Sequence, residues 1–198
     1  MEFEQVVRRR RMVRRYRPDP VPKVQLERVL SLARKTPSAG FSQGQFFVVV
    51  QDEARRGEIA RLAREPDYVG RGFAPWLSVA PVHVVLCTSE PAYHERYREP
   101  DKLGPAGEER PWAVPFWYVD AGCSMMLLLL AAVSEGLAAG FLRLDGDASG
   151  AVKELLEIPQ EVTIVGLVTL GFGETDRRSG SLRRGWKDES EAIRWERW

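Results

Sequence analysis

The sequence predicts one α/β or α+β sandwich domain, and three observations support this. Apolar runs rich in Val, Ile and Leu, at 46–50, 82–86 and 163–170, are typical of buried strands. Segments with helical periodicity separate these runs. A length of 198 residues with 44% hydrophobic and 29% charged residues is ordinary for one soluble domain. We therefore expect one domain over 1–198, with helices packed on the faces of a sheet.

The first half of the chain alternates helices with a strand. A short helix is expected over 2–11, with arginines near its end, where positive charge suits the helix dipole. An amphipathic helix is expected over 24–35, followed by turn-forming residues at 36–44. The apolar run 46–50 is predicted as a buried strand, and 53–64 as a charged, solvated helix.

The second half contains a long irregular stretch and a long apolar helix. Residues 88–118 are polar, aromatic and rich in Pro and Gly without a clear period, which indicates a lid or an insertion. Residues 118–137 predict a helix that is apolar nearly all round, so it belongs in a core or a subunit interface. A strand over 139–144, a helix over 149–156 and a strand over 163–170 follow.

Composition and cysteine use indicate a cytoplasmic protein. Cys87 and Cys123 lie in apolar runs and are expected to be buried free thiols. The start of the chain is acidic and lacks a secretory apolar core. The longest apolar run, 125–133, is far shorter than the roughly 20 residues of a membrane span, so no membrane partner is expected.

The densest charge lies between Arg8 and Arg15, which reads RRRRMVRR in a chain with a formal net charge of only +1. Three interpretations stay open on the residues alone. The run is a solvated surface, a patch for nucleic acid or anionic membrane, or a phosphate site in which a few arginines touch the ligand. The near-neutral balance argues against nucleic acid as a partner.

Several short segments occur in a characteristic order along the chain, and the first of them lies within the arginine run. They are RRMVRRY at 10–16 before Pro-Val-Pro at 20–22, PSAGFSQ at 37–43, Ala-Pro at 80–81, Asp-Ala-Gly at 120–122, LEIP at 156–159, and RRGW at 183–186. In this order they resemble the FMN-dependent nitroreductase family, which opens with Arg-Arg-Ser-x-Arg-x-Phe and continues with Pro-Ser-x-x-Asn-x-Gln-Pro-Trp.

The resemblance covers nearly the whole chain and implies a fold and an assembly. The implied fold is an α+β, three-layer α/β/α sandwich with a mixed, mostly antiparallel sheet. The implied assembly is a homodimer with a domain-swapped tail and with flavin sites at the interface. The apolar helix at 118–137 gives such a dimer a separate physical reason, since it must be covered on every side.

The resemblance also implies which residues bind FMN. Arg10, Arg11 and Arg14, with Met12 beside them, would hold the phosphate and ribityl end, joined by Arg183 or Arg184 from the tail. The remaining implied contacts are Pro37, Ser38, Ala39 and Gln43 along the flavin and Phe141, Leu142 and Arg143 beneath it, with the Arg143 amide near N5. No side chain is expected to be catalytic or to bind metal. Met12, Phe41 and Gly185 depart from the family's Ser, Asn and Pro.

The implied activity is hydride transfer from NAD(P)H through flavin N5 to a small aromatic or electron-poor acceptor: a nitro compound, a quinone or an activated enone. Residues 88–118, which carry Tyr93, Tyr97, Trp112, Phe116 and Trp117, would be a substrate lid or a flap over the dimer partner. A specialised biosynthetic reductase or a flavin-consuming oxygenase is the alternative on the same scaffold. A nucleic-acid-binding module is the non-enzymatic alternative.

Overall fold

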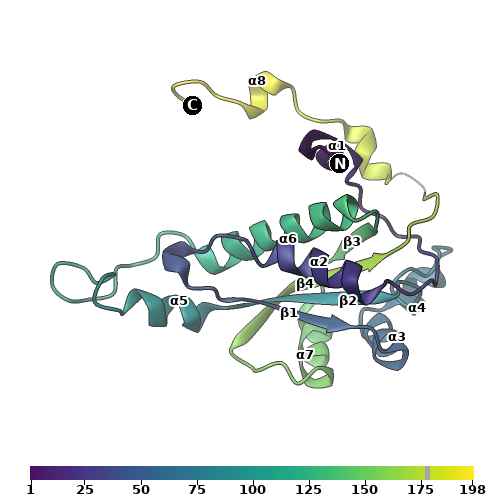
Figure 1. Cartoon of the computed structure of the whole chain (residues 1–198), viewed down its shortest axis with the longest axis horizontal. Coiled ribbons are helices and arrows are strands. Elements are labelled where there is room, and N and C mark those ends of the chain that lie inside the picture. The colour runs from purple at the N-terminus through teal and green to yellow at the C-terminus, as the bar shows by residue number, and fades with distance from the viewer. Residues whose placement is uncertain (177–178) are drawn as a thin grey trace.

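The computed structural model describes residues 1–176 and 179–198, and Figure 1 shows one sheet with helices on both faces. The strands are β1 (Gln45–Val50), β2 (Val82–Ser89), β3 (Ala138–Leu142) and β4 (Val162–Gly171). Their spatial order is β1-β2-β4-β3, and every neighbouring pair is antiparallel. An isolated bridge from Met12 to Ala139 adds a parallel pairing at β3. The predicted α+β sandwich is confirmed.

One face of the sheet is covered by α2 (Lys23–Ala33) and the long α6 (Phe116–Ser134). Helix α2 turns Leu26, Val29 and Ala33 inward, at the spacing expected of one helix face. They join buried side chains of α6 and of β2–β4 in one apolar cluster. The short α1 (Phe3–Arg9) packs against α6 and buries only Val6.

The opposite face is covered by α3 (Glu53–Leu62) and α7 (Gly146–Leu155), with the short α4 (Glu65–Val69) beside α3. A second apolar cluster lies between these helices and the sheet. The sequence pattern predicted one helix over 53–64. The structure instead ends α3 at Leu62 and starts α4 after Arg64, whose φ of 62° is left-handed and breaks the helix.

The stretch expected to be irregular over 88–118 is partly regular. Strand β2 continues through Ser89, whose Oγ then accepts the Ala92 N–H and caps α5 (Glu90–Tyr97). Helix α6 already begins at Phe116. The irregular part is therefore the shorter segment 98–115, which we call the outer loop.

Helix α6 has an uncovered apolar stripe. Among the described residues it is the helix whose 19 residues and mean hydropathy of 1.7 satisfy the length and composition of a membrane span, although 44% of that window is buried here. A core helix meets the same two criteria, and α6 packs on α2 and the sheet. Its exposed stripe consists of Phe116, Val119, Cys123 and Met126.

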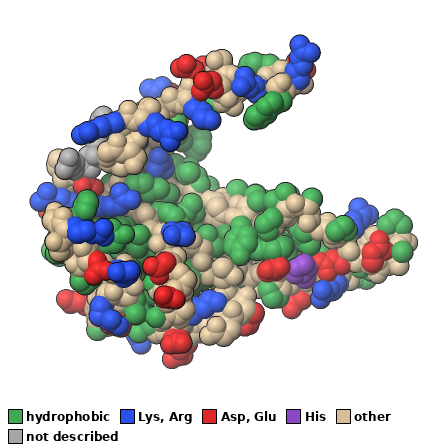
Figure 2. Space-filling view, turned by 180° about the vertical axis from the view of Figure 1, so that it is seen from behind, with side chains coloured by type: hydrophobic (Ala, Val, Ile, Leu, Met, Phe, Trp, Pro, Cys, Tyr) green, Lys and Arg blue, Asp and Glu red, His purple; other side chains and the backbone are tan. Residues whose placement is uncertain are grey.

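The C-terminal tail extends away from the sandwich. It carries a short 3-10 turn (Gly180–Arg184) and α8 (Glu189–Ala192), and it arches over the body (Figure 1). Trp186, Trp195 and Trp198 are 94%, 80% and 100% exposed. Figure 2 shows apolar side chains on the body surface below the arch. Both the tail and α6 thus present apolar surface to solvent in the single chain.

Candidate functional site

We call residues 8–16 the arginine segment. From Met12 onward it lies along the outer edge of β3. The Val13 N–H donates to the Ala139 carbonyl at 2.9 Å, next to the Met12–Ala139 bridge. Further along, Tyr16 forms an antiparallel bridge with Gly173, just beyond β4. This pairing brings Arg10, Arg11 and Met12 beside the strand that leads into residues 141–143, two groups that the sequence analysis assigned to one cofactor.

Gly140 makes this close approach sterically feasible. A Cβ added to Gly140 would lie 2.4 Å from the Val13 carbonyl oxygen and 3.0 Å from the Trp76 ring. No side chain fits at that separation, so the close contact between the arginine segment and β3 requires glycine at position 140. Trp76 is itself fixed, because the buried Glu65 carboxylate accepts the Trp76 and Leu77 N–H groups at 2.6 Å each.

Tyr16 fixes the end of the arginine segment. Its hydroxyl donates to the Val13 carbonyl at 2.8 Å and lies 2.8 Å from the Thr169 Oγ1 on β4. Burial raises the pKa of the Tyr16 phenol, so it stays a neutral donor. The two contacts of the Tyr16 hydroxyl thereby fix the backbone around Arg14 to strand β4.

The arginines divide by their partners. Arg8 pairs with Glu4 at 2.6 Å and Arg15 with Glu174 at 3.0 Å, both at the surface. Arg9, Arg10 and Arg11 form no ion pair within residues 1–176 and 179–198.

Arg14 has a different environment from the paired arginines. Its backbone N–H donates to Asp176 at 2.7 Å, and its guanidinium lies 5.5 Å from the centre of the Trp76 ring. Stacking of this kind keeps the guanidinium donors available to a ligand. Arg9, Arg10, Arg11 and Arg14 thus have no acidic partner for their guanidinium groups in the described part of the chain, but Arg9 still belongs to α1, whereas Arg10, Arg11 and Arg14 flank the Met12–Ala139 bridge.

A groove adjoins the end of β3. It has a volume of about 710 Å³ and lies between α4 and the β3–α7 connection, lined by Arg64, Asp67, Tyr68, Arg71, Leu142 and Arg143. This volume is in the range of small-molecule sites. The resemblance of the motifs implied Leu142 and Arg143 as cofactor contacts but did not indicate the wall formed by α4. Pro66, in the first turn of α4, was the available signal for a second helix there.

Residues 37–43 form a strained turn at a different place. Phe41 and Gln43 have φ values of 61° and 52°, unusual for residues with side chains. The Ala39 N–H donates to Asp120 at 2.9 Å, and the Gln43 N–H donates to the Ser38 Oγ at 2.9 Å. The turn thus depends on contacts from α6 and from its own Ser38. Pro37 precedes it. We call residues 37–43 the inner loop.

The structure does not bring all the predicted cofactor residues together in one chain. The inner loop contacts α5 and the start of α6, whereas the arginine segment borders β3 beside Trp76. In Figure 1 these two places lie at opposite ends of the sheet. Arg183 and Arg184 lie on the exposed tail. One chain therefore presents separate parts of the predicted site.

The comparison with protein families decides the classification. The model described as the nitroreductase family matches residues 7–172. The chain belongs to the nitroreductase family. This family of flavin-dependent oxidoreductases accounts for the resemblance of the sequence motifs.

Individual relatives and solved structures match this chain over most of its length. The chain is 29% identical over 177 residues to an NADH dehydrogenase from Thermus thermophilus, covering 83% of each protein. A nitroreductase family protein from Streptococcus pneumoniae superposes with a TM-score of 0.74 at 21% identity, covering 99% and 100% of the two chains. An FMN-dependent nitroreductase from Clostridium difficile superposes with a TM-score of 0.72 at 16% identity, covering 98% of each. At these identities the two structures show the fold alone.

The cysteines and histidines of this nitroreductase lie apart from the groove. Cys87 is buried, and burial raises its thiol pKa to about 11, but Cys123 is exposed on α6, so the expectation that both are buried is wrong for Cys123. Cys123 belongs to the apolar stripe of α6 that is exposed in the single chain. His83 is buried with Nε2 at 2.8 Å from the Leu77 carbonyl. No cluster of metal-binding side chains occurs in the part of the chain that the structure describes.

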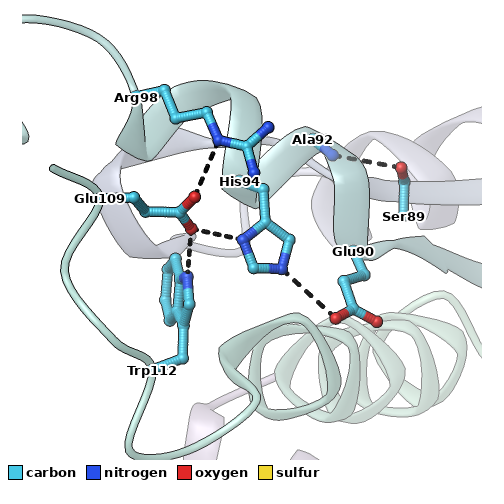
Figure 3. Close-up of polar contacts among 7 residues, drawn as sticks. All are labelled: Ser89, Glu90, Ala92, His94, Arg98, Glu109 and Trp112. Carbon is cyan, nitrogen blue, oxygen red and sulfur yellow. Dashed lines mark hydrogen bonds and ion pairs between the residues drawn. The ribbon is translucent and has the colours of Figure 1, made fainter.

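His94 belongs to a polar cluster at the outer loop, drawn in Figure 3. Its Nδ1 contacts Glu109, and its Nε2 lies 3.3 Å from Glu90. Arg98 and the Trp112 indole also donate to Glu109, at 2.9 and 3.0 Å. Glu109 thus ties the outer loop to α5.

The aromatic side chains expected to stack on a substrate pack mostly on one another. Tyr93 and Trp117 are buried, and the rings of Tyr97 and Trp112 lie 4.3 Å apart. Their packing stabilises the base of the outer loop. Phe116, which is 40% exposed, remains accessible in the single chain.

Proposed function

We propose that this protein is an FMN-dependent oxidoreductase that passes hydride from NAD(P)H to a small aromatic or electron-poor acceptor. The observation that carries the proposal is the pairing of the arginine segment with β3. It brings the arginines beside β3, whose last residue, Leu142, lines the groove together with Arg143. A cofactor with its phosphate at the arginines would thus extend along β3 toward the groove.

The donor chemistry of the segment suits a phosphate. A partly buried phosphate needs charge-assisted donors, and Arg10, Arg11 and Arg14 offer planar forks without acidic side-chain partners among the described residues. Met12 supplies no hydroxyl there, so the proposed contacts depend on the guanidinium groups. Arg8 and Arg15, paired with Glu4 and Glu174, stay structural.

The groove suits a flat ring. Leu142 provides an apolar floor, and the Arg143 backbone amide would donate to the ring nitrogen N5. When bound, FMN supplies the hydride chemistry, so the protein itself needs no acid, base or nucleophile. The α4 wall, with Arg64 and Arg71, would face the same ring and limit access of water.

We further propose that the working unit is a cytoplasmic homodimer with exchanged tails. Two observations support it. The inner loop lies away from the arginine segment of its own chain, so a second copy would bring one to the other. The exposed stripe of α6 and the exposed tryptophans of the tail offer apolar surface for the same association.

The visible spectrum of the purified protein tests the cofactor. We expect a yellow protein, or a colourless one that regains flavin bands with FMN. Steady-state assays with NADH and NADPH against nitro, quinone and enone acceptors then test the reaction. Loss of reduced flavin under oxygen without acceptor turnover would indicate an oxygenase instead. A protein that takes up no FMN but binds DNA with a steep salt dependence would overturn the proposal.

Light scattering during gel filtration tests the dimer. Met126→Asp places a charge on the α6 stripe, where Met126 is 44% exposed, and should shift the protein to monomer. Val24→Asp is the matched control, because Val24 is 61% exposed on α2 and lies outside that stripe. Equal mass for both variants and the wild type would contradict an interface at Met126.

A further inference from the structure

Arg96 on α5 contacts both loops at the end of the sheet where α5 lies. Its Nε donates to the Gly40 carbonyl of the inner loop at 2.8 Å. Its Nη1 and Nη2 donate to the two Asp101 oxygens of the outer loop at 2.7 and 2.8 Å, and Nη1 also reaches Glu99 at 3.0 Å. Only a guanidinium, with donors in one plane, serves both sides at once.

The inner loop needs an external restraint. Gly40, Phe41 and Gln43 all have φ between 52° and 61°. A left-handed residue with a large side chain is strained, and such strain persists only where the surroundings hold it. Phe41 does not provide the restraint, because its side chain is 71% exposed. The contacts that hold the turn must come from the neighbouring helices.

Helix α5 supplies most of that restraint. The Tyr97 ring packs so closely on Gly40 that a Cβ there would lie 2.7 Å from the ring. The Tyr93 hydroxyl donates to Asp120 at 2.8 Å, and the same Asp120 oxygen accepts the Ala39 N–H at 2.9 Å. Burial of Asp120, which is only 8% exposed, keeps water from competing for that carboxylate.

Other side chains at this end of α5 hold the outer loop. His94 and Arg98 contact Glu109, as Figure 3 shows, while Arg96 holds Asp101 nearer the start of that loop. Tyr97 packs its ring against both loops, and Arg96 is the α5 side chain that donates hydrogen bonds to both of them. Within the described part of the chain, the Arg98 side chain donates to Glu109 and forms no hydrogen bond with the inner loop, which makes it a natural control.

We propose that Arg96 is a positioning residue that holds the inner loop in its left-handed conformation and couples it to the outer loop through Asp101. A loosened outer loop then loosens the residues that would line the flavin. The relevance to flavin binding rests on the proposed function. The coupling of the two loops does not depend on it.

Hydrogen–deuterium exchange of the cofactor-free protein tests the restraint. Arg96→Ala should speed amide exchange at residues 39–43 by about tenfold, because a charge-assisted hydrogen bond to the Gly40 carbonyl is lost. Arg98→Ala should leave those amides within about twofold of wild type. Arg96→Lys should fall between them. Equal exchange at 39–43 in the two alanine variants would overturn the restraint by Arg96.

Asp101→Ala tests the coupling on a surface residue, since the Asp101 side chain is 61% exposed and its loss spares the core. We expect faster exchange at 39–43, by about threefold, although the substitution lies in the outer loop. If the outer loop loosens while 39–43 keeps its wild-type exchange, the coupling is wrong. This variant decides the question even if Arg96→Ala fails to fold.

FMN affinity, measured by flavin fluorescence, links the restraint to the cofactor. Arg96→Ala should weaken FMN binding by about tenfold and Arg98→Ala by no more than about twofold. A wild-type protein that binds no FMN would refute the proposed function but leave the exchange result standing. Faster exchange at 39–43 with unchanged FMN affinity would refute the positioning role.

Discussion

The Tyr16 hydroxyl and the Thr169 Oγ1 lie 2.8 Å apart although 153 positions separate them in the sequence. With the Val13 carbonyl, they form a buried polar contact that fastens the arginine segment to β4. Both groups are satisfied as long as the phenol is present. Its removal would leave the Val13 carbonyl without this donor.

Tyr16→Phe should therefore lower the free energy of unfolding by about 1–3 kcal/mol, the cost of a buried polar group left unpaired. Urea denaturation measures it. Tyr118→Phe is the control. Because Tyr118 is 45% exposed and water solvates its hydroxyl, the free energy of unfolding should change by less than about 0.5 kcal/mol. Equal losses would mean that the Tyr16 contact contributes nothing beyond ring packing.

Gly140→Ala should destabilise the protein by about 1–3 kcal/mol and displace the arginine segment, because its Cβ would collide with the Val13 carbonyl. Gly150→Ala, in the interior of α7 with open space around it, should instead stabilise by about 0.5–1 kcal/mol. Thermal unfolding of both variants measures the contrast. A neutral Gly140→Ala would show that the segment can move aside freely.

Arg14→Ala should abolish retention of FMN on purification, whereas Arg9→Ala should leave it nearly unchanged. Arg14 is held against Trp76 beside β3, while Arg9 ends α1 at the surface. Flavin content per chain, from absorbance after gel filtration, gives the answer. Equal loss in both variants would mean that the cluster acts only as a diffuse positive surface.

His83 should make the protein less stable in mild acid. Burial lowers its pKa from the ordinary 6.5 to about 4, and its Nδ1 has no partner among the described residues. The unfolded chain therefore binds a proton first, and stability falls as the pH drops from about 6.5 to about 4. Denaturant titrations across that range, repeated with His83→Gln, measure this; an unchanged slope in the variant would assign it to another group.

His94 should act with the opposite sign. The Glu109 carboxylate, followed by Glu90, raises the pKa of His94, although burial opposes this. A raised pKa gives stability that is complete below 6.5 and is lost as the pH rises through the folded value. Protection factors in the outer loop, which correct for the intrinsic pH dependence of amide exchange, should thus fall above about pH 6.5, and His94→Gln should remove this fall. Arg98, the other cation at Glu109, is kept in this variant, so a pH effect that persists in it would contradict the assignment to His94.

Much of the fold could be predicted because its signals are local. The apolar runs at β1, β2 and β4 and the periodicity of α2 need no distant partner to be recognised. Helix α5 was not predicted from the sequence, because its eight residues are rich in aromatic and charged side chains and have no clear apolar face. Its Ser-Glu-Pro start, with Ser89 as cap, was the usable local signal.

The candidate site was less accessible to sequence reasoning, since its geometry depends on distant pairs. Nothing near Arg15 in the sequence predicts its ion pair with Glu174. The same applies to the contact of Arg96 with Gly40, which joins two segments that were interpreted separately. The motifs identified the inner loop and the arginine segment, but only the sheet topology shows that they lie at different ends.

The pairing of Tyr16 with Thr169 also bears on how the chain folds. Contacts between residues so far apart form late, because a long stretch of chain must first be ordered. During synthesis, 153 further residues must leave the ribosome after Tyr16 before its partner exists. We therefore expect the arginine segment to remain exposed during synthesis until β4 has formed and can receive it.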